Sequence, residues 1–425
     1  MTARMQCVQC LKKIFEEKRF FKELKNDFSQ NDSAFANFLI LTALRRKTAI
    51  EKMLKSMILK KIPQKNKILN EILLLGATEI LYMDTPDYAA INEYVDIAKK
   101  TTDKFCAGMV NAVLRKVISK KDEMQNAICL PQNFVQILSK DYDVKEIRQV
   151  EQMLMYEAPL DITPLKDPVF WAQKLGGILF ENGTIRLLNP RGDIALLEGY
   201  DKGAWFVQDL AASMPVCLLG DIKGKKALDL CAAPGGKTAQ LLSKGAIVTA
   251  LDISKERLNT LKENMLRLNL TDNLSVLAAD AFEYLNKTDE KFDIVLLDAP
   301  CSATGTFRKH PEILYFKDDA DVLSRLEIQK NLLDKASSHV NINGILLYCT
   351  CSLCKIEGEK QVEQFLKTHQ NFELLPFEAK NLKICEAKSL GHLVFDKQVL
   401  RTLPYDMKDD GGMDGFFAAC LKRCA

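Results

Sequence analysis

The chain has 425 residues, of which 47% are hydrophobic and 27% charged, and its formal net charge is +3 at pH 7. That length predicts two or three domains, and the composition is ordinary for a globular protein. No apolar run approaches the roughly 20 residues of a membrane span, and the N-terminus lacks the apolar region of a signal peptide, so we expect a cytoplasmic protein without a membrane partner. Its 13 cysteines are therefore expected to be reduced thiols.

Basic residues are concentrated at the start of the chain. Through residue 130 there are 23 Lys and Arg against 15 Asp and Glu, a net charge of +8, whereas the remainder carries 36 against 41, a net charge of −5. Within the basic part, residues 45–67 hold nine basic side chains and one acid, Glu51. Such a surface would attract a polyanion such as RNA, although a solvated helix face explains the charges equally well.

Residues 1–130 are predicted to form an all-helical domain. Apolar residues recur at three- and four-residue spacing in three segments, 35–44, 68–83 and 107–118. Breaks fall at three places, Pro63, Pro86 and the Thr-Thr-Asp run at 101–103. These features are typical of a compact helical bundle.

A small α/β linking domain is predicted for residues 131–223. Helical spacing over 144–157 gives way to two short strand-like pieces, 183–188 and 193–199. Glycine, asparagine and proline residues separate these pieces, which is typical of turns between short strands.

Residues 224–425 show the pattern of a Rossmann-like domain. Apolar, strand-like runs bounded by turns occur at 226–233, 246–254, 274–280, 292–300 and 344–351. Helical patterns lie between them, as at 237–245 and 256–270. Because strands this apolar are buried on both faces, they predict a parallel sheet between two helix layers, and hence an α/β fold class.

A glycine-rich turn, CAAPGGKT, follows the first of these strands. A phosphate-binding P-loop would need glycine where Cys231 stands, and Pro234 has no N–H to offer a phosphate. An NTPase is therefore disfavoured, and ATP hydrolysis that depends on Lys237 would reveal one. A loop that follows a strand and opens a helix is still the expected position of a ligand in this fold.

Acidic residues end the neighbouring strands. Asp252 stands 17 residues after Gly235, where a carboxylate commonly binds ribose hydroxyls, and Asp280 and Asp298 end the next two strands. Together with Asp229 on the first strand, these acids would line a crevice at the carboxyl edge of the sheet. An adenosine ligand without a phosphate fits that crevice best, and this points to S-adenosylmethionine.

Two cysteines follow strand ends at the same edge. Cys301 and Cys351 are flanked by Pro, Ser and Thr, unlike Cys217, Cys349 and Cys420, which we interpret as buried apolar residues. A thiolate that attacks C6 of cytosine makes C5 nucleophilic enough to accept a methyl group, provided that an acid stabilises the charge at N3. Asp298 is placed for that acid role, whereas the spacing leaves open which cysteine attacks.

A zinc site is the alternative use of the cysteines. Cys351-x-x-Cys354 and Cys7-x-x-Cys10 could pair as metal ligands, but they fall in different predicted domains and neither has a nearby histidine. Cys7 and Cys10 also stand at helical spacing. We therefore expect no metal.

Three segments resemble the signatures of the Sun-type RNA cytosine-5 methyltransferases. They are LDLCAAPGGKTAQL at 228–241, DIVLLDAPCSATGTFRKHPEI at 293–313 and GILLYCTCSLCKIEGEKQV at 344–362. Residues 206–215 and 400–423 are similar to flanking segments of that family. Residues 91–117 are similar to the NusB-like, all-α domain of the bacterial small-subunit (16S) ribosomal RNA methyltransferase B group.

The resemblance implies a function for the chain and a role for each matching residue. It implies methyl transfer from S-adenosylmethionine to C5 of a cytidine in 16S rRNA, free or in an early particle, by a monomer. Cys351 would be the nucleophile on C6 and Cys301 would help to release the product, although the DNA enzymes attack with the Pro-Cys cysteine instead. The residues that would bind or border the cofactor are Cys231, Ala232, Ala233, Pro234, Gly235, Gly236, Lys237, Asp252, Asp280 and Asp298. The alternatives are an RNA-binding factor without activity and a methyltransferase that acts on another RNA, such as tRNA.

Three features depart from the pattern of the family. Ala303 stands where a glycine is usual, and residues 160–168 match the corresponding strand of the family poorly, which leaves their contact with RNA open. Arg308 and His310 could contact RNA, but a structural role at a helix start before Pro311 explains them equally well.

Overall fold

The computed structural model describes residues 2–58, 62–188, 192–378, 381, 387–390 and 398–425, and its contacts divide the chain into two compact units. Unit 1 consists of Met1–Gln136, Asp143–Tyr156 and Lys309–Phe316, and unit 2 of Ile137–Tyr142, Glu157–Arg308 and Lys317–Ala425. The finer, three-domain division with limits at residues 130 and 223 stays a prediction. None of the helices in the described ranges combines the length and the apolar character that a membrane span needs.

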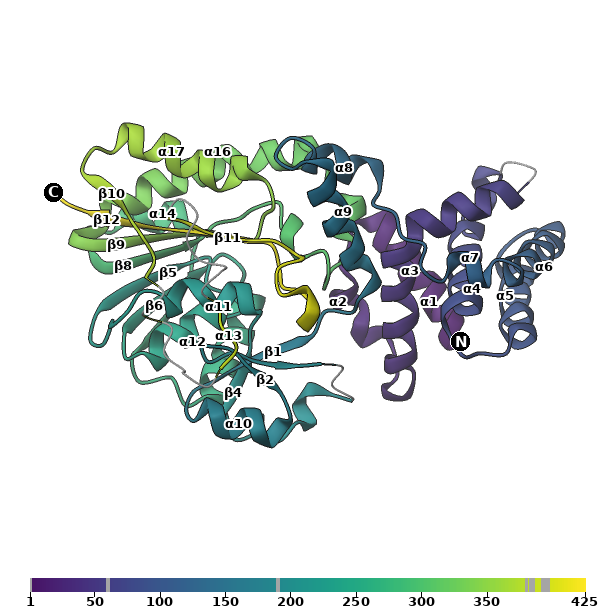
Figure 1. Ribbon diagram of the computed structural model, residues 1–425, viewed down its shortest axis with the longest axis horizontal. Helices are drawn as coiled ribbons and strands as arrows, with labels where there is room; N and C mark the ends of the chain where they lie inside the picture. Colours follow the sequence, from purple (N-terminus) through teal and green to yellow (C-terminus); the bar gives the residue numbers. More distant parts are fainter. Residues whose placement is uncertain (1, 59–61, 189–191, 379–380, 382–386, 391–397) are drawn as a thin grey trace. The chain divides into compact units, whose positions relative to one another are not determined.

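Unit 1 is built from helices, mostly purple and blue in Figure 1. They are α1 (Ala3–Glu17), α2 (Phe21–Leu24), α3 (Gln30–Met57), α4 (Leu69–Tyr82), α5 (Asp87–Thr101), α6 (Lys104–Ile118), α7 (Lys121–Met124), most of α8 (Gln132–Leu138), α9 (Val144–Gln152) and α15 (Ile313–Phe316). The three periodic segments lie in α3, α4 and α6, and their apolar faces share one core. Pro63 caps a 3₁₀ turn after α3, and Pro86 caps α5, which ends at Thr101, so the predicted all-helical character of this part and its three breaks are confirmed.

The segment Lys309–Phe316 packs inside unit 1, although its sequence falls in the predicted third domain. The buried carboxylate of Glu312 accepts a hydrogen bond from the backbone N–H of Phe21 at 3.0 Å. The hydroxyl of Tyr315 donates to the carbonyl of Leu44 at 2.9 Å. Both contacts join residues more than 250 positions apart, which no local pattern predicts.

Arg308 and His310 belong to different units, and each contacts protein groups within its own unit. In unit 2, Arg308 is 2% exposed and donates to the carbonyl of Gly411. In unit 1, the ring of His310 packs edge-on against Phe20, with centroids 5.7 Å apart, and burial lowers the pKa of this imidazole to about 3. These contacts favour the structural interpretation of both residues over contact with RNA.

Unit 2 contains a small antiparallel sheet with the strand order β2-β3-β1-β4. Its elements are β1 (Leu160–Pro164), β2 (Ile178–Leu179), β3 (Ile185–Leu187), β4 (Trp205–Val207) and the adjacent helix α10 (Pro168–Leu175). The strand predicted at 183–188 is β3. The strand predicted at 193–199 is wrong, because the Asp193 carboxylate accepts the N–H of Ala195 at 3.0 Å and closes a 3₁₀ turn over Ile194–Leu196.

A buried ion pair joins β1 to β3. Arg186 donates from Nε and Nη2 to the two carboxylate oxygens of Asp161 at 2.7 and 2.8 Å, and the two side chains are 0% and 1% exposed. Asp161→Ala would leave a buried guanidinium without its anion, so we expect it to lower the free energy of unfolding in urea by about 3–5 kcal/mol. Lys174→Ala, which breaks the exposed Lys174–Glu198 pair, should cost less than about 1 kcal/mol. Equal losses would contradict this role of Asp161.

The large sheet of unit 2 has the order β10-β12-β9-β8-β5-β6-β7, with β11 beside β12. The strands are β5 (Lys226–Leu230), β6 (Ile247–Asp252), β7 (Leu274–Ala278), β8 (Phe292–Asp298), β9 (Val340–Thr350), β10 (Phe372–Leu375), β11 (Leu400–Thr402) and β12 (Phe416–Arg423). From β7 to β9 the pairs are parallel, as predicted, but β10, β11 and β9 each pair antiparallel with β12. The sheet is therefore mixed rather than wholly parallel. Antiparallel pairing does not require the crossover helix that a parallel pair needs.

Helices cover both faces of this sheet, as Figure 1 shows. One layer holds α11 (Leu210–Cys217), α12 (Gly236–Ser243) and α13 (Lys255–Arg267), and the other holds α14 (Ala281–Lys287), α16 (Asp319–Ser338) and α17 (Glu359–Thr368). Along β8, Ile294 and Leu296 pack into the first layer, whereas Val295 and Leu297 pack into the second. The predicted Rossmann-like architecture is confirmed. Strands β5, β6 and β8 are largely buried as predicted, whereas the edge strand β7 is partly exposed, because only one neighbouring strand covers it.

Candidate functional site

A cavity of about 740 Å³ lies at the carboxyl ends of the parallel strands in unit 2. From the predicted set, its lining includes Cys231, Ala233, Asp252, Asp280, Asp298, Cys301 and Cys351. The other predicted residues, Ala232, Pro234, Gly235, Gly236 and Lys237, belong to the same loop and the start of α12 but not to that lining. Parallel strands bring their carboxyl ends to one edge, which explains how residues 120 positions apart share one cavity.

The loop after β5 adopts a tight turn that is tied to β6. Cys231 and Gly235 have positive φ angles of 62° and 104°, and α12 begins at the next residue, Gly236. The N–H of Ala233 donates to the Asp252 carboxylate at 3.1 Å. The hydrogen bond thus fixes the turn against the acid at the end of β6.

Two acids of the cavity lie at the ends of β6 and β7. Asp252 is 2% exposed and accepts the N–H of Ser254 at 2.9 Å in addition to that of Ala233. Asp280 caps α14, accepting the N–H of Glu283 at 3.0 Å. Both carboxylates are therefore held by backbone groups while they line the cavity.

Lys237 and Asp298 form an ion pair, of which Asp298 lines the cavity. The Lys237 Nζ lies 2.8 Å from Asp298 Oδ2 and 4.8 Å from the centroid of the Phe416 ring, and Lys237 is 8% exposed. Burial lowers the pKa of Lys237, but the negative charge of Asp298 and its hydrogen bond raise it more, so that the net pKa is above the ordinary value. Lys237 is thus a cation held against one carboxylate.

Asp229 is buried behind this pair. Its Oδ2 accepts a hydrogen bond from Thr238 Oγ1 at 2.6 Å, whereas its Oδ1 has no hydrogen-bond partner among the described residues. Burial raises the pKa of Asp229 to about 7, well above its ordinary value, so the carboxyl carries its proton below neutral pH.

The raised pKa of Asp229 predicts a pH-dependent stability. Between its unfolded pKa and about 7, the folded state binds the proton that the unfolded state has lost, so this contribution to stability falls as pH rises. From pH 5 to pH 8 the wild type should lose about 2–3 kcal/mol relative to Asp229→Asn, as measured by urea denaturation. A pH-independent difference between the two proteins would contradict the assignment.

The two cysteines meet because β8 and β9 are parallel neighbours. Asp298 pairs with Cys349 in the register, so the segments that follow both strands run side by side. The Sγ atoms of Cys301 and Cys351 lie 3.5 Å apart. The hydrogen bond with Cys351, together with burial, raises the pKa of Cys301 well above its ordinary value. Cys349 itself is fully buried, as predicted.

The cavity also contains residues that the sequence pattern did not reveal. Ile253 and Phe282, which are 70% and 41% exposed, follow Asp252 and Asp280 directly or after one residue. An apolar residue just after a strand-end acid is a usable signal for such a position. Arg325 reaches the cavity from α16, and nothing in the local sequence distinguishes it from a solvated helix residue.

The geometry gives the zinc alternative no support. Cys7 and Cys10 are buried in the apolar core of unit 1, and burial raises the pKa of both thiols. Cys354 lies in unit 2 and is 4% exposed. Over the described ranges, no group of three or more His, Cys, Asp or Glu side chains could hold a metal ion.

Sequence comparisons match both parts of the chain. The family model for 16S rRNA methyltransferase RsmB/F matches residues 216–422, and the NusB family model matches residues 1–119. The chain is 30% identical to "Ribosomal RNA small subunit methyltransferase B" of Photorhabdus laumondii, over 94% of this chain and 93% of that protein. It is 31% identical to the protein of the same name from Pasteurella multocida, over 88% and 84% of the two chains.

Solved structures share the fold. The crystal structure of PH0851 superposes with a TM-score of 0.76 at 20% identity, covering 100% of this chain and 99% of that chain. The structure of NSun6 from Pyrococcus horikoshii with SFG superposes with a TM-score of 0.55 at 18% identity, covering 69% of this chain and 98% of that chain.

Proposed function

The chain belongs to the RsmB/F family of 16S rRNA methyltransferases, and we propose that it transfers a methyl group from S-adenosylmethionine to C5 of a cytidine in 16S rRNA. In this proposal Cys351 forms a covalent bond with C6 of the cytosine, and Cys301 assists the release of the product. The observation that carries it is the 3.5 Å approach of the two Sγ atoms in the cavity that Asp298 also lines.

The residues around the cavity fit an adenosine-type cofactor. Asp252 offers carboxylate oxygens at the end of β6 to ribose hydroxyls, and the exposed Ile253 and Phe282 offer apolar surface to a base. Asp280 and the Cys231 loop would border the same ligand. When bound, S-adenosylmethionine supplies a methyl group activated by its sulfonium charge.

Cys351 and the Lys237–Asp298 pair would activate the base. The Cys351 thiolate forms a bond to C6. The negative charge that develops at N3 is neutralised by a proton from the Lys237–Asp298 pair and stabilised by the positive charge of Lys237. C5 thereby becomes an enamine-like nucleophile that accepts the methyl group. The hydrogen bond with Cys351, together with burial, raises the pKa of Cys301 and so favours the thiol form of Cys301.

Cys301 would act at the release step. The C5 proton must leave and the S–C6 bond must break, with the proton at N3 returning to the pair. Once Cys351 is a thioether it is neutral, so its charge no longer raises the pKa of Cys301. Cys301 can then lose its proton to solvent, and its thiolate takes the C5 proton as the S–C6 bond breaks and Cys351 leaves as a thiolate.

Exposed lysines of unit 1 support contact with the rRNA. Lys52, Lys55, Lys65 and Lys67 are exposed, whereas Arg45 is only 7% exposed and belongs to the interior of the bundle. Residues 60 and 61 of the same basic stretch lie outside the described residues. A base within structured RNA must be unstacked before Cys351 can reach it, and cations on unit 1 would hold the surrounding strand.

The proposed function is tested by methylation with S-adenosylmethionine carrying a labelled methyl group. The full-length protein is mixed with free 16S rRNA, with small ribosomal subunits and with tRNA, and bisulfite sequencing locates the product. Labelled 5-methylcytidine in 16S rRNA is the expected result. If the label appears only in tRNA, the substrate is tRNA and not rRNA. If the protein binds rRNA without any methyl transfer, it is an RNA-binding factor without activity.

A further inference from the structure

Glu357 is a fully buried carboxylate that the chemistry proposed above does not use. It ends the 3₁₀ turn Lys355–Glu357, which follows β9 and Cys351. Its carboxylate accepts four hydrogen bonds, from Ser302 N at 2.8 Å, Ser302 Oγ at 2.5 Å, Ser352 Oγ at 2.5 Å and Gln329 Nε2 at 2.9 Å. A buried acceptor with this many donors is held in one position.

The donors identify what Glu357 holds. Ser302 directly follows Cys301, and Ser352 directly follows Cys351, so one carboxylate binds the residue after each reactive cysteine. Further hydrogen bonds join the two segments: the Oγ atoms of Ser302 and Ser352 lie 3.1 Å apart, and the N–H of Leu353 donates to Thr304 Oγ1 at 2.9 Å. Glu357 is thus a shared anchor for both cysteine segments.

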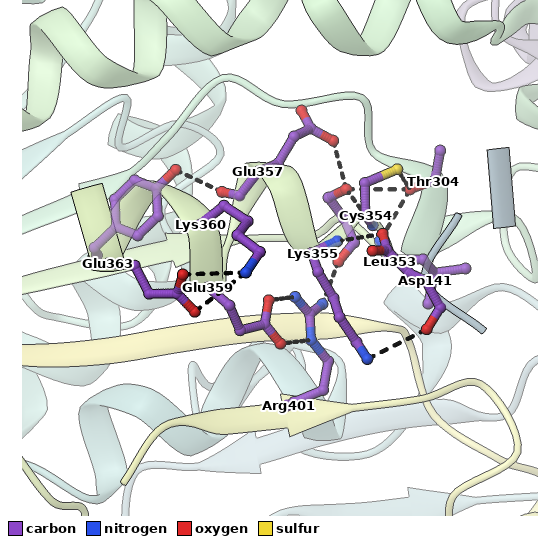
Figure 2. Close-up of polar contacts among 12 residues, drawn as sticks. Asp141, Thr304, Leu353, Cys354, Lys355, Glu357, Glu359, Lys360, Glu363 and Arg401 are labelled. Atoms are coloured by element: carbon purple, nitrogen blue, oxygen red, sulfur yellow. Dashed lines mark hydrogen bonds and ion pairs between the residues drawn. The ribbon is translucent and has the colours of Figure 1, made fainter. Parts of the chain in front are cut away.

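The arrangement uses both carboxylate oxygens of Glu357 as acceptors, with two donors on each. All four donors are neutral N–H or O–H groups, and each needs an oxygen acceptor. A glutamine would present one oxygen and one NH₂ group, so two of the four donors would lose their oxygen acceptor. Figure 2 shows the Glu357 carboxylate pointing away from the neighbouring Arg401, whose guanidinium pairs with Glu359 at 3.0 and 2.5 Å.

We propose that Glu357 is a positioning residue that sets the separation of Cys301 and Cys351, and so controls both formation and release of the covalent intermediate. This inference rests on the proposed function. A displacement of about 1 Å at a reacting group can cost 10²-fold in rate, and the two Sγ atoms stand only 3.5 Å apart. Loosening the anchor should therefore slow the chemistry without weakening the binding of either substrate.

The test compares Glu357→Gln with Glu363→Gln in the full-length protein. Glu363 lies on α17 and pairs with Lys360 at the surface, so its substitution is the matched control (Figure 2). We expect Glu357→Gln to lower kcat about 10- to 100-fold, with KM for rRNA and the Kd for S-adenosylmethionine within about twofold of wild type. The control should retain wild-type kcat, and thermal unfolding of both variants verifies that they fold.

Other outcomes would overturn the positioning role. Wild-type kcat in a folded Glu357→Gln protein contradicts it, as does a loss that appears only in KM or in cofactor affinity. If Glu357→Gln does not fold, Ser352→Ala decides, because it removes one donor and should lower kcat severalfold at unchanged KM. A wild-type protein without methyl transfer would instead contradict the proposed function, which keeps the two failures distinct.

Discussion

Cys351→Ala is expected to abolish methyl transfer, whereas Cys301→Ala is expected to accumulate a covalent protein–RNA complex that survives denaturing electrophoresis. Without the Cys351 thiolate no bond to C6 forms, and the rate should fall on the order of 10⁴-fold or more. Without Cys301 the bond still forms, but the step that removes the C5 proton is slowed. The 3.5 Å contact between the two Sγ atoms places both groups within reach of one base.

Two further variants complete this experiment. The double variant should form no complex, since it lacks the nucleophile. Cys424→Ala, which removes an exposed cysteine at the end of the chain, should behave like the wild type. If Cys351→Ala alone traps RNA, the two roles are exchanged and the cysteine after Pro300 is the nucleophile.

Lys237→Met should lower kcat about 10²- to 10³-fold, and Asp298→Asn should have an effect of the same order. The physical reason is that a buried cation beside its carboxylate is preorganised to meet the charge that develops at N3, and removing one such group commonly costs this much. Single-turnover methylation of 16S rRNA measures the effect on the chemical step.

The control for Lys237→Met is the same change at Lys262, an exposed position on α13. The control should keep wild-type activity. Titration calorimetry with S-adenosylmethionine separates the two roles open to Lys237. If Lys237→Met loses cofactor affinity in proportion to activity, Lys237 is a cofactor ligand, as the sequence motif predicts, and not part of the catalytic pair.

The sequence alone was sufficient for three helices of unit 1, α3, α4 and α6, and for the strands at the centre of the large sheet. Apolar spacing in α4 and α6 and the apolar runs of β5, β6 and β8 are local signals, and a local pattern is read directly from neighbouring residues. The strand predicted at 193–199 failed, because one capping contact of Asp193 outweighed the propensity of its neighbours. The sequence did not predict the antiparallel pairing of β12 with β9, because the direction of a strand in a sheet depends on its partner strand.

The candidate site likewise has features that the sequence shows and features that only the structure shows. Acids and cysteines that end strands are visible in the sequence, since each stands at a fixed offset from an apolar run. The sequence does not reveal that Lys237 pairs with Asp298, or that Arg325 reaches the cavity from α16. It also does not reveal that Glu357 anchors Ser302 and Ser352. The sequence by itself thus determined which residue types carry the chemistry. Only the tertiary structure decided which of them touch, because strand register and long-range packing, rather than neighbours in sequence, set those distances.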